Sequence, residues 1–135
     1  MATFFHPGHV AFLKAARDFG DWLIVGLLSD EVAGGYKRRP IMNLAERVAV
    51  VEACRYVDEV LPNAPYRITT QFLDEHDISV VVHGDDITPE TVADVFGPVH
   101  AAGKLRLVRY TPGISTTDLI RRVRQGGLGQ SGPPA

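Results

Sequence analysis

Residues 22–28 read WLIVGLL, an unbroken run of apolar side chains. A run without alternation predicts a strand buried on both faces, as in a parallel sheet between helices. Residues 78–83 (ISVVVH) repeat this pattern, and shorter strands are expected at 59–61 and 105–109. Helical patterns lie between and around these strands, at residues 9–19, 44–56, 70–76, 89–96 and 116–124. The alternation of strand and helix predicts the α/β fold class with right-handed crossovers.

The length and composition predict one compact domain. The chain has 135 residues, of which 45% are hydrophobic and 22% are charged, as in ordinary globular proteins. We expect this domain to span residues 1–124 and residues 125–135 (QGGLGQSGPPA) to form a flexible tail, because glycine, proline and polar residues bury little surface.

The charge and the cysteine content restrict partners and compartment. A formal net charge of −2 gives no overall field for nucleic acid or for an anionic membrane. A single cysteine, Cys54, allows no internal disulfide and permits a reducing compartment. The sequence shows no apolar run of membrane-spanning length and no secretory leader, so the expected location is the cytoplasm.

A histidine pair lies at the entry to the first expected helix, in the sequence His6-Pro7-Gly8-His9. Two imidazoles that bracket a glycine at a helix N-terminus can both face a bound anion, and the helix dipole favours negative charge there. The alternative is a plain turn that carries two solvated histidines.

A hydroxyl-rich segment, residues 113–118 (GISTTD), begins the last expected helix. Hydroxyl groups together with unpaired backbone N–H groups at such an end form a cradle for phosphate. The alternative is an ordinary N-cap, which Ser115 would provide alone, with Asp118 at the capping-box spacing. Asn43 and Glu46 show the same spacing before the helix expected at 44–56.

Two further segments are candidates for ligand contact. Residues 34–40 (GGYKRRP) place Lys37, Arg38 and Arg39 in one loop, which suits a triphosphate but also an ordinary solvated loop. Gly84, Asp85 and Asp86 follow the strand expected at 78–83, at the edge where open α/β sheets bind ligands. These aspartates suit contacts to a base amino group or a metal, or alternatively a cap for the next helix.

The motifs, taken in this order, resemble the cytidylyltransferase family, which carries a His-x-Gly-His near its start and a Gly-Ile-Ser-Thr-Thr near its end. The resemblance covers Phe4 to Val123, and residues 40–69 are especially similar to phosphoethanolamine cytidylyltransferases. Glycerol-3-phosphate and phosphocholine cytidylyltransferases share much of the pattern. The resemblance implies a Rossmann-like parallel sheet with helices on both faces and a homodimer. It also implies transfer of a cytidylyl group from CTP to a small phosphorylated alcohol, with phosphoethanolamine favoured.

The resemblance implies specific roles in a direct in-line displacement at the α-phosphorus of CTP. His6 and His9 would contact the α-phosphate region and the leaving group, and Lys37, helped by Arg38 or Arg39, would neutralise the triphosphate. A magnesium ion is expected on the triphosphate. The other positions implied to bind the nucleotide are Gly8, Arg55, Gly84, Asp85, Ile114, Ser115 and Thr116. Among these, Arg55 is also implied to link the active site to the dimer, and its alternative role is to satisfy carbonyl groups at a helix end.

The sequence departs from the family pattern in three places. Residues 1–5 are too few for the family's first strand, which lies at the centre of the sheet, so we expect this strand to be truncated. Tyr110 stands where the family has a phosphate-binding arginine, and Arg109 lies one residue earlier, which in a strand points to the opposite face. The loop that carries Lys37 is also shorter. These departures keep open a nucleotide-binding protein with weak or absent catalysis.

Overall fold

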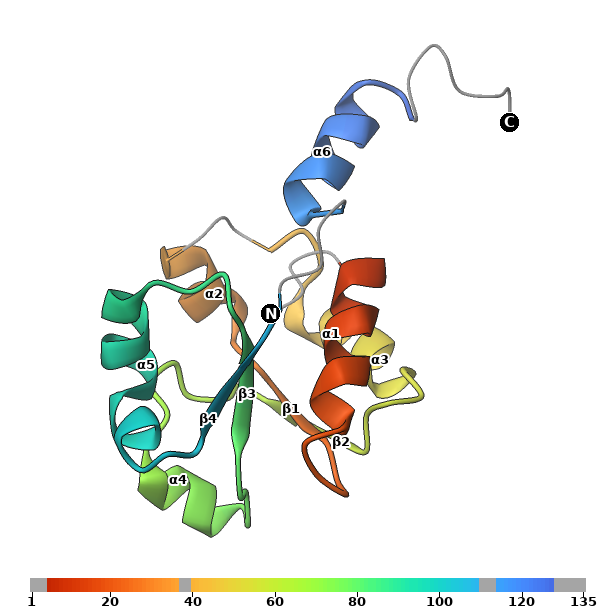
Figure 1. Cartoon of the computed structure of the whole chain (residues 1–135). Coiled ribbons are helices and arrows are strands. Elements are labelled where there is room, and N and C mark those ends of the chain that lie inside the picture. The colour runs from red at the N-terminus through yellow and green to blue at the C-terminus, as the bar shows by residue number, and fades with distance from the viewer. Residues whose placement is uncertain (1–4, 37–39, 110–113, 128–135) are drawn as a thin grey trace.

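Strands and helices alternate along the chain in the computed structural model, which describes residues 5–36, 40–109 and 114–127 (Figure 1). The α/β class is therefore confirmed. The elements are α1 Pro7–Arg17, β1 Ile24–Leu27, α2 Asp30–Tyr36, α3 Leu44–Glu52, β2 Glu59–Pro62, α4 Thr70–Glu75, β3 Val81–Gly84, α5 Pro89–Ala101, β4 Leu105–Val108 and α6 Thr116–Arg124.

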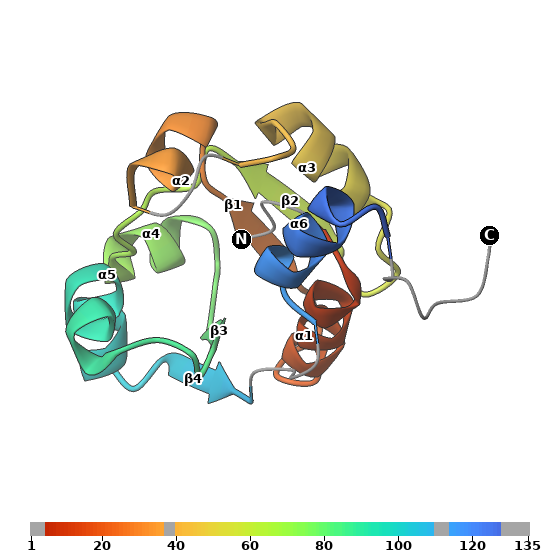
Figure 2. The same ribbon diagram turned by 90° about the horizontal axis from the view of Figure 1, so that it is seen from above.

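The strands form two parallel pairs. β1 pairs with β2, with Val25 opposite Val60, and β3 pairs with β4, with Val82 opposite Arg106. Within the described ranges no ladder joins β1 to β3, and the two pairs lie apart when viewed from above (Figure 2). This break falls where we expected the truncated central strand, between the two strands that begin near residues 22 and 78.

Each strand pair has its own hydrophobic core. The first core gathers side chains from α1, α3 and β1 around Leu13, Leu27 and Val51, which are almost completely buried. The second core gathers side chains from α4 and α5 around Leu73, Phe96 and Val99, with Val81 of β3 and Leu105 of β4 packed against them. α1 and α3 therefore pack on the first core and α4 and α5 on the second, as Figure 1 shows, while α1 also approaches β4 of the second pair.

The expected burial of β1 on both faces is wrong. Val25 and Leu27 are buried, whereas Gly26 between them is exposed. Trp22 lies outside the strand and is 63% exposed, with its indole N–H donating to Glu59 at 3.3 Å. The physical reason is that Val25 and Leu27 pack in one core with Leu13 of α1 and Val51 of α3, whereas the opposite side of β1 carries Gly26 and the half-buried Ile24.

Three helices differ from the sequence expectation, and the first is α3, which ends at Glu52 and not at residue 56. α2 was not expected, because its two glycines favoured a loop, but Ser29 caps its first turn by accepting from the Val32 N–H at 3.2 Å. α5 extends well past residue 96, through a kink at Phe96 that Pro98 explains. The Val95 carbonyl accepts a hydrogen bond from the Ile68 N–H at 2.9 Å at this kink, so the distorted turn remains satisfied.

Candidate functional site

The two histidines of the first motif cap the N-terminus of α1. Nδ1 of His6, the N-cap residue, accepts a hydrogen bond from the Gly8 N–H at 3.0 Å. Nδ1 of His9 accepts from the His6 N–H at 3.2 Å, which completes a reciprocal capping box. The imidazoles are close neighbours, with ring centroids 3.9 Å apart and ring planes tilted by 46°. The alternative of two solvated histidines in a turn is therefore wrong.

The capping bonds decide which ring nitrogen carries the proton. A ring nitrogen that accepts a hydrogen bond carries no proton. In both neutral rings the proton is therefore assigned to Nε2. Partial burial lowers the pKa of His6 below its usual value of 6.5, which favours the neutral form. Phe5 stacks on His9 with ring centroids 5.6 Å apart and so restrains its ring. The end of α1 thus holds two oriented imidazoles whose N–H groups are on Nε2.

Gly8 brings the two principal motifs together. A β-carbon at this position would lie 2.7 Å from Cε1 of His6, so no larger residue fits without moving the ring. The same β-carbon would lie 3.5 Å from Cγ2 of Ile114, in the segment that leads into α6. The His6–His9 motif and the Ile114–Thr116 motif, from opposite ends of the sequence, are therefore in contact.

Ser115 is the N-cap of α6. Its Oγ accepts from the Asp118 N–H at 3.1 Å, and Thr116 is the first helical residue. The capping role that we had considered as the alternative is therefore real for the Ser115 hydroxyl. This capping bond still allows an anion to bind at the N-terminus of α6. The positive end of the helix dipole remains directed toward the space in front of Thr116.

The carboxyl end of β3 presents Gly84 and Asp85 at the sheet edge. The Asp85 N–H donates to the Val108 carbonyl at 2.8 Å, which extends the β3–β4 pairing, and the Asp85 side chain is exposed. Nδ1 of His83 lies 2.9 Å from the Gly84 carbonyl, which can only accept, so this ring carries its proton on Nδ1. The helix that follows is capped by Thr88, so the aspartates do not cap it.

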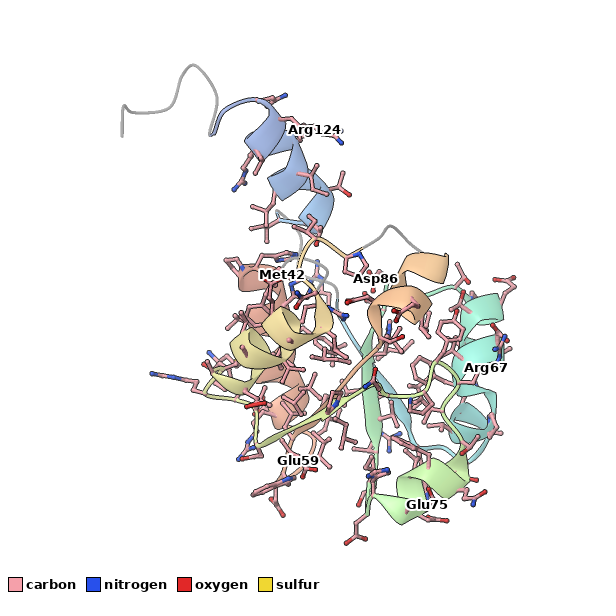
Figure 3. The ribbon with its side chains drawn as sticks, turned by 180° about the vertical axis from the view of Figure 1, so that it is seen from behind. Met42, Glu59, Arg67, Glu75, Asp86 and Arg124 are labelled. Atoms are coloured by element: carbon pink, nitrogen blue, oxygen red, sulfur yellow. The ribbon has the colours of Figure 1, made fainter. Side chains whose placement is uncertain are left out.

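A β-carbon at Gly84 would come within 2.7 Å of an Asp86 carboxylate oxygen. Figure 3 shows Asp86 and Met42 at the end of the body that faces α6, and Glu59 and Glu75 at the opposite end. The end of β3 therefore lies at the same end of the molecule as the start of α6.

Arg55 follows α3 and is exposed. It lines an open pocket of about 440 Å³ together with Phe5, Val10 and Tyr56. Phe5 directly precedes the histidine motif, so the pocket joins Arg55 to the beginning of α1.

Some expected site residues lie outside the described residues. These are Lys37, Arg38, Arg39 and Tyr110, together with most of the expected tail. Arg109, one residue before Tyr110, is described and exposed.

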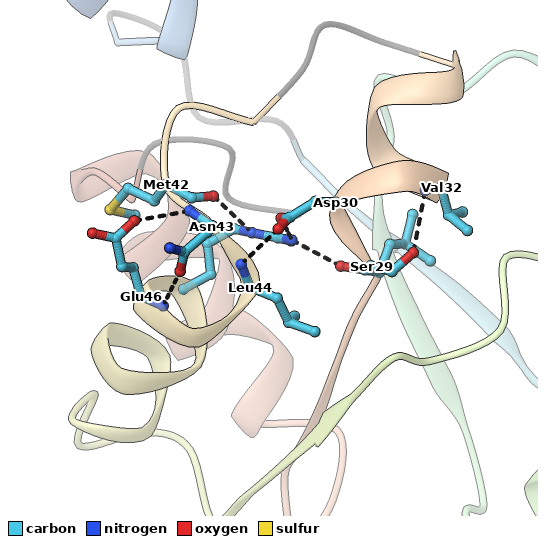
Figure 4. Close-up of polar contacts among 9 residues, drawn as sticks. Ser29, Asp30, Val32, Met42, Asn43, Leu44 and Glu46 are labelled. Atoms are coloured by element: carbon cyan, nitrogen blue, oxygen red, sulfur yellow. Dashed lines mark hydrogen bonds and ion pairs between the residues drawn. The ribbon is translucent and has the colours of Figure 1, made fainter.

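One ion pair was not expected from the sequence, between the fully buried Arg47 of α3 and the partly exposed Asp30 of α2 (Figure 4). A signal was available in the sequence. Leu44, Arg47, Val48 and Val51 follow the spacing of one helical face, which places the arginine where an apolar core residue is expected.

Residues 5–36, 40–109 and 114–127 contain no cluster of three or more histidine, cysteine, aspartate or glutamate side chains that could hold a metal ion. None of their helices is both long enough and apolar enough to cross a bilayer.

Comparisons with known proteins point to one family. Residues 3–122 match the family described as cytidylyltransferase-like. The chain is 44% identical to an ethanolamine-phosphate cytidylyltransferase of Dictyostelium discoideum over 88% of its own length and 34% of the relative's. It is 43% identical to the mouse enzyme of the same name, over 87% of its own length and 30% of the relative's. It is 42% identical to human choline-phosphate cytidylyltransferase A, over 88% of its own length and 33% of the relative's.

The chain spans about a third of the length of these relatives. Among solved structures, it resembles a lipopolysaccharide core biosynthesis protein from Thermoplasma volcanium GSS1, with a TM-score of 0.63 and 22% identity. The match covers 83% of this chain and 91% of the other, and it supports the Rossmann-like α/β fold.

Proposed function

The chain belongs to the cytidylyltransferase-like family, and from this premise we propose that it transfers a cytidylyl group from CTP to phosphoethanolamine. The observation that carries the proposal is the contact between the two family motifs. A β-carbon added at Gly8 would lie 3.5 Å from Cγ2 of Ile114. This contact supports one site in which the imidazoles of α1 and the N-terminus of α6 act on the same polyphosphate.

The proposed reaction is an in-line displacement. An oxygen of the phosphoethanolamine phosphate attacks the α-phosphorus of CTP, and the bond from that phosphorus to the oxygen bridging it to the β-phosphate breaks. The products are CDP-ethanolamine and pyrophosphate. Because the chemistry requires no covalent protein intermediate, the protein contributes orientation and stabilisation of negative charge.

His6 and His9 are proposed to donate from Nε2 to the α-phosphate region and to the leaving group. Their capping bonds support this role, because they fix the direction of both rings before CTP arrives. Neutral imidazoles suffice for it, since a preorganised N–H donor stabilises developing charge without a proton transfer.

The remaining contacts concern the nucleotide. Ser115 and Thr116 are proposed to face the terminal phosphates at the start of α6, and Lys37, with Arg38 or Arg39, to neutralise the triphosphate. Gly8, Arg55, Gly84, Asp85 and Ile114 are proposed to complete the nucleotide site. Magnesium is proposed to arrive with the triphosphate, whose negative charge it would help to neutralise.

We also propose that the chain acts as a homodimer in the cytoplasm. The open pocket lined by Phe5, Val10, Tyr56 and Arg55 supports the dimer, because it offers apolar surface beside the site together with the exposed Val50. A single half-buried cysteine suits a reducing compartment.

A second acceptor is phosphocholine. The 42% identity to a choline-phosphate enzyme is close to the 44% for an ethanolamine-phosphate enzyme, so identity alone does not separate the two. Glycerol 3-phosphate remains a third candidate acceptor, and a nucleotide-binding protein with weak catalysis is the alternative from another class.

The test is a pyrophosphate-release assay that crosses CTP, ATP, GTP and UTP with these three acceptors. We expect turnover with CTP well above the other nucleotides, and with phosphoethanolamine above the other acceptors. Equal or faster turnover with ATP would remove the cytidylyl assignment. Binding of CTP without release of pyrophosphate would favour the nucleotide-binding alternative.

A further inference from the structure

His83 lies in β3, directly before Gly84 and Asp85, yet the proposed function gives this side chain no task. Its ring is half-buried and packs against Phe96 of α5, with ring centroids 5.4 Å apart and ring planes tilted by 59°. Phe96 is itself buried in the second core. The position of the imidazole is therefore set by the packing of that core.

The His83 ring holds one side of the peptide group that joins Gly84 to Asp85. Nδ1 of His83 donates to the Gly84 carbonyl at 2.9 Å, and on the other side the Asp85 N–H donates to the Val108 carbonyl of β4 at 2.8 Å. A trans peptide group directs its C=O and N–H in opposite directions, and every peptide bond of the described residues is trans. The Gly84 carbonyl therefore points away from β4, toward the edge of β3 that has no strand partner within the described ranges.

Stability alone does not require a histidine at this place. Gly84 is only half-buried, and water can satisfy a carbonyl at an open edge. The bond instead restricts rotation of the peptide group, which would swing the side chain of Asp85 away from its present direction. Asp86 lies against the same glycine, because a β-carbon at Gly84 would come within 2.7 Å of its carboxylate oxygen. The histidine is better explained by the direction that it gives to this strand end.

We propose that His83 is a positioning residue for CTP, acting through Gly84 and Asp85. These two residues lie at the carboxyl end of β3, the sheet edge at which α/β proteins bind ligands. A peptide group that is already fixed meets the nucleotide at a smaller entropic cost. The proposal rests on the proposed function, because that function assigns Gly84 and Asp85 to the nucleotide.

The first experiment separates the hydrogen bond of His83 from its ring contact. His83→Phe keeps a ring against Phe96 but has no donor, whereas the amide of His83→Asn places a donor near the position of Nδ1 and loses the ring contact. We expect His83→Phe to keep the melting temperature and to raise the KM for CTP about three- to tenfold, the effect of one lost hydrogen bond. His83→Asn should lower the melting temperature and keep the KM near that of the wild type. In both variants kcat should change far less, because a contact made equally in the ground and transition states affects KM.

His76 provides the matched control. Its ring also packs against a phenylalanine of the second core, Phe72, with ring centroids 4.4 Å apart. It directly follows α4, at the opposite end of the molecule from α6 (Figure 1). His76→Phe and His76→Asn should leave the KM for CTP unchanged. An equal rise of KM in His83→Asn and His83→Phe, or an unchanged KM in His83→Phe, would overturn the proposal.

Hydrogen exchange gives a readout that needs no turnover. The Asp85 N–H belongs to the same peptide group as the Gly84 carbonyl, so its exchange should accelerate about three- to tenfold in His83→Phe and stay unchanged in His83→Asn. The amides of α5 should keep their wild-type exchange in His83→Phe. Unchanged exchange at Asp85 in His83→Phe, or acceleration throughout β3 and α5, contradicts the positioning role.

Direct titration with CTP separates this proposal from the proposed function. We expect the Kd for CTP to follow the KM, raised in His83→Phe and near the wild-type value in His83→Asn. If the wild type binds CTP but releases no pyrophosphate, the proposed function fails while this order of Kd values still supports the role of His83. A Kd that is the same in His83→Phe and the wild type, or a wild type that does not bind CTP, removes that role.

Discussion

At the scale of single residues, the two histidines combine a structural and a chemical task. Nδ1 of each ring caps the first turn of α1, and Nε2 carries the hydrogen that can be donated. In each ring, the capping bond to Nδ1 therefore fixes the direction in which the Nε2 N–H points. Substitutions can separate the two tasks, because asparagine replaces the cap without replacing the distal donor.

His6→Asn and His6→Ala should differ in stability but not in catalysis. Asparagine is a good N-cap residue, so His6→Asn should keep the melting temperature, whereas His6→Ala should lose about 1 kcal/mol of unfolding free energy. Both lack the distal donor, and we expect each to lower kcat about 10²- to 10³-fold, with a smaller effect on CTP affinity. Thermal unfolding and pyrophosphate release give the two quantities. Wild-type turnover in His6→Asn would reduce the role of His6 to capping.

The pKa of His6 predicts a pH dependence of stability. Burial lowers this pKa below 6.5 in the folded chain, so as the pH falls the unfolded chain binds the proton first. The contribution of His6 to stability is therefore full above about pH 6.5 and is lost as the pH falls through the lowered folded pKa. Protonation also removes Nδ1 as the acceptor for the Gly8 N–H.

The measurement compares the melting temperatures of wild type and His6→Asn from about pH 7.5 to about pH 5. We expect the melting temperature of the wild type to fall relative to that of His6→Asn as the pH is lowered toward about pH 5. A difference that stays constant over this range contradicts the assignment to His6.

At the scale of elements, the helices depend on different supports. α5 buries Val95, Phe96 and Val99, so packing holds it even across its kink. In α6 none of the described residues is buried, and Figure 1 shows this helix extending away from the strand pairs. A helix of this length is marginal in water without packing, so its N-cap matters more than that of α5.

Ser115→Ala should therefore disturb the site more than the fold. It removes the acceptor for the Asp118 N–H and should cost the helix about 1 kcal/mol, while α6 contributes little to the core. We expect the KM for CTP to rise several-fold with little change in melting temperature. The control is Thr69→Ala, which removes the N-cap of α4, at the opposite end of the molecule from α6. It should lower the melting temperature and leave KM unchanged; the reverse pattern would contradict this account.

At the scale of the whole molecule, the two strand pairs with their separate cores are the main feature. β1 and β3 each pair on one side only within the described ranges, so each has an edge without a strand partner. Buried backbone groups without partners cost about 1–3 kcal/mol each, against a total stability of about 5–15 kcal/mol for a typical domain. A parallel strand between β1 and β3 would satisfy both edges and join the two cores.

We expect that adding an apolar strand of about six residues, ending in Gly-x-Phe-Asp, before residue 1 will raise the melting temperature and the CTP-dependent rate together. Thermal unfolding and pyrophosphate release are compared for the two forms at matched concentration. A polar extension of the same length is the control and should change neither. If the apolar extension also changes neither, the centre of the sheet does not need this strand.

The sequence by itself determined the fold class, the order of the elements other than α2, and the two helix starts at Asn43 and Ser115, both of which are N-caps in the structure. These features are local, because hydrophobic period and capping spacing act within a few residues. The contact of Gly8 with Ile114 and the pairing of buried Arg47 with Asp30 were decided by tertiary structure. Each joins residues of separate elements through packing, which spacing along the chain does not predict. The incomplete burial of β1 has the same origin. An apolar run shows that a strand can be buried on both faces, but the neighbouring elements decide which of its faces are covered.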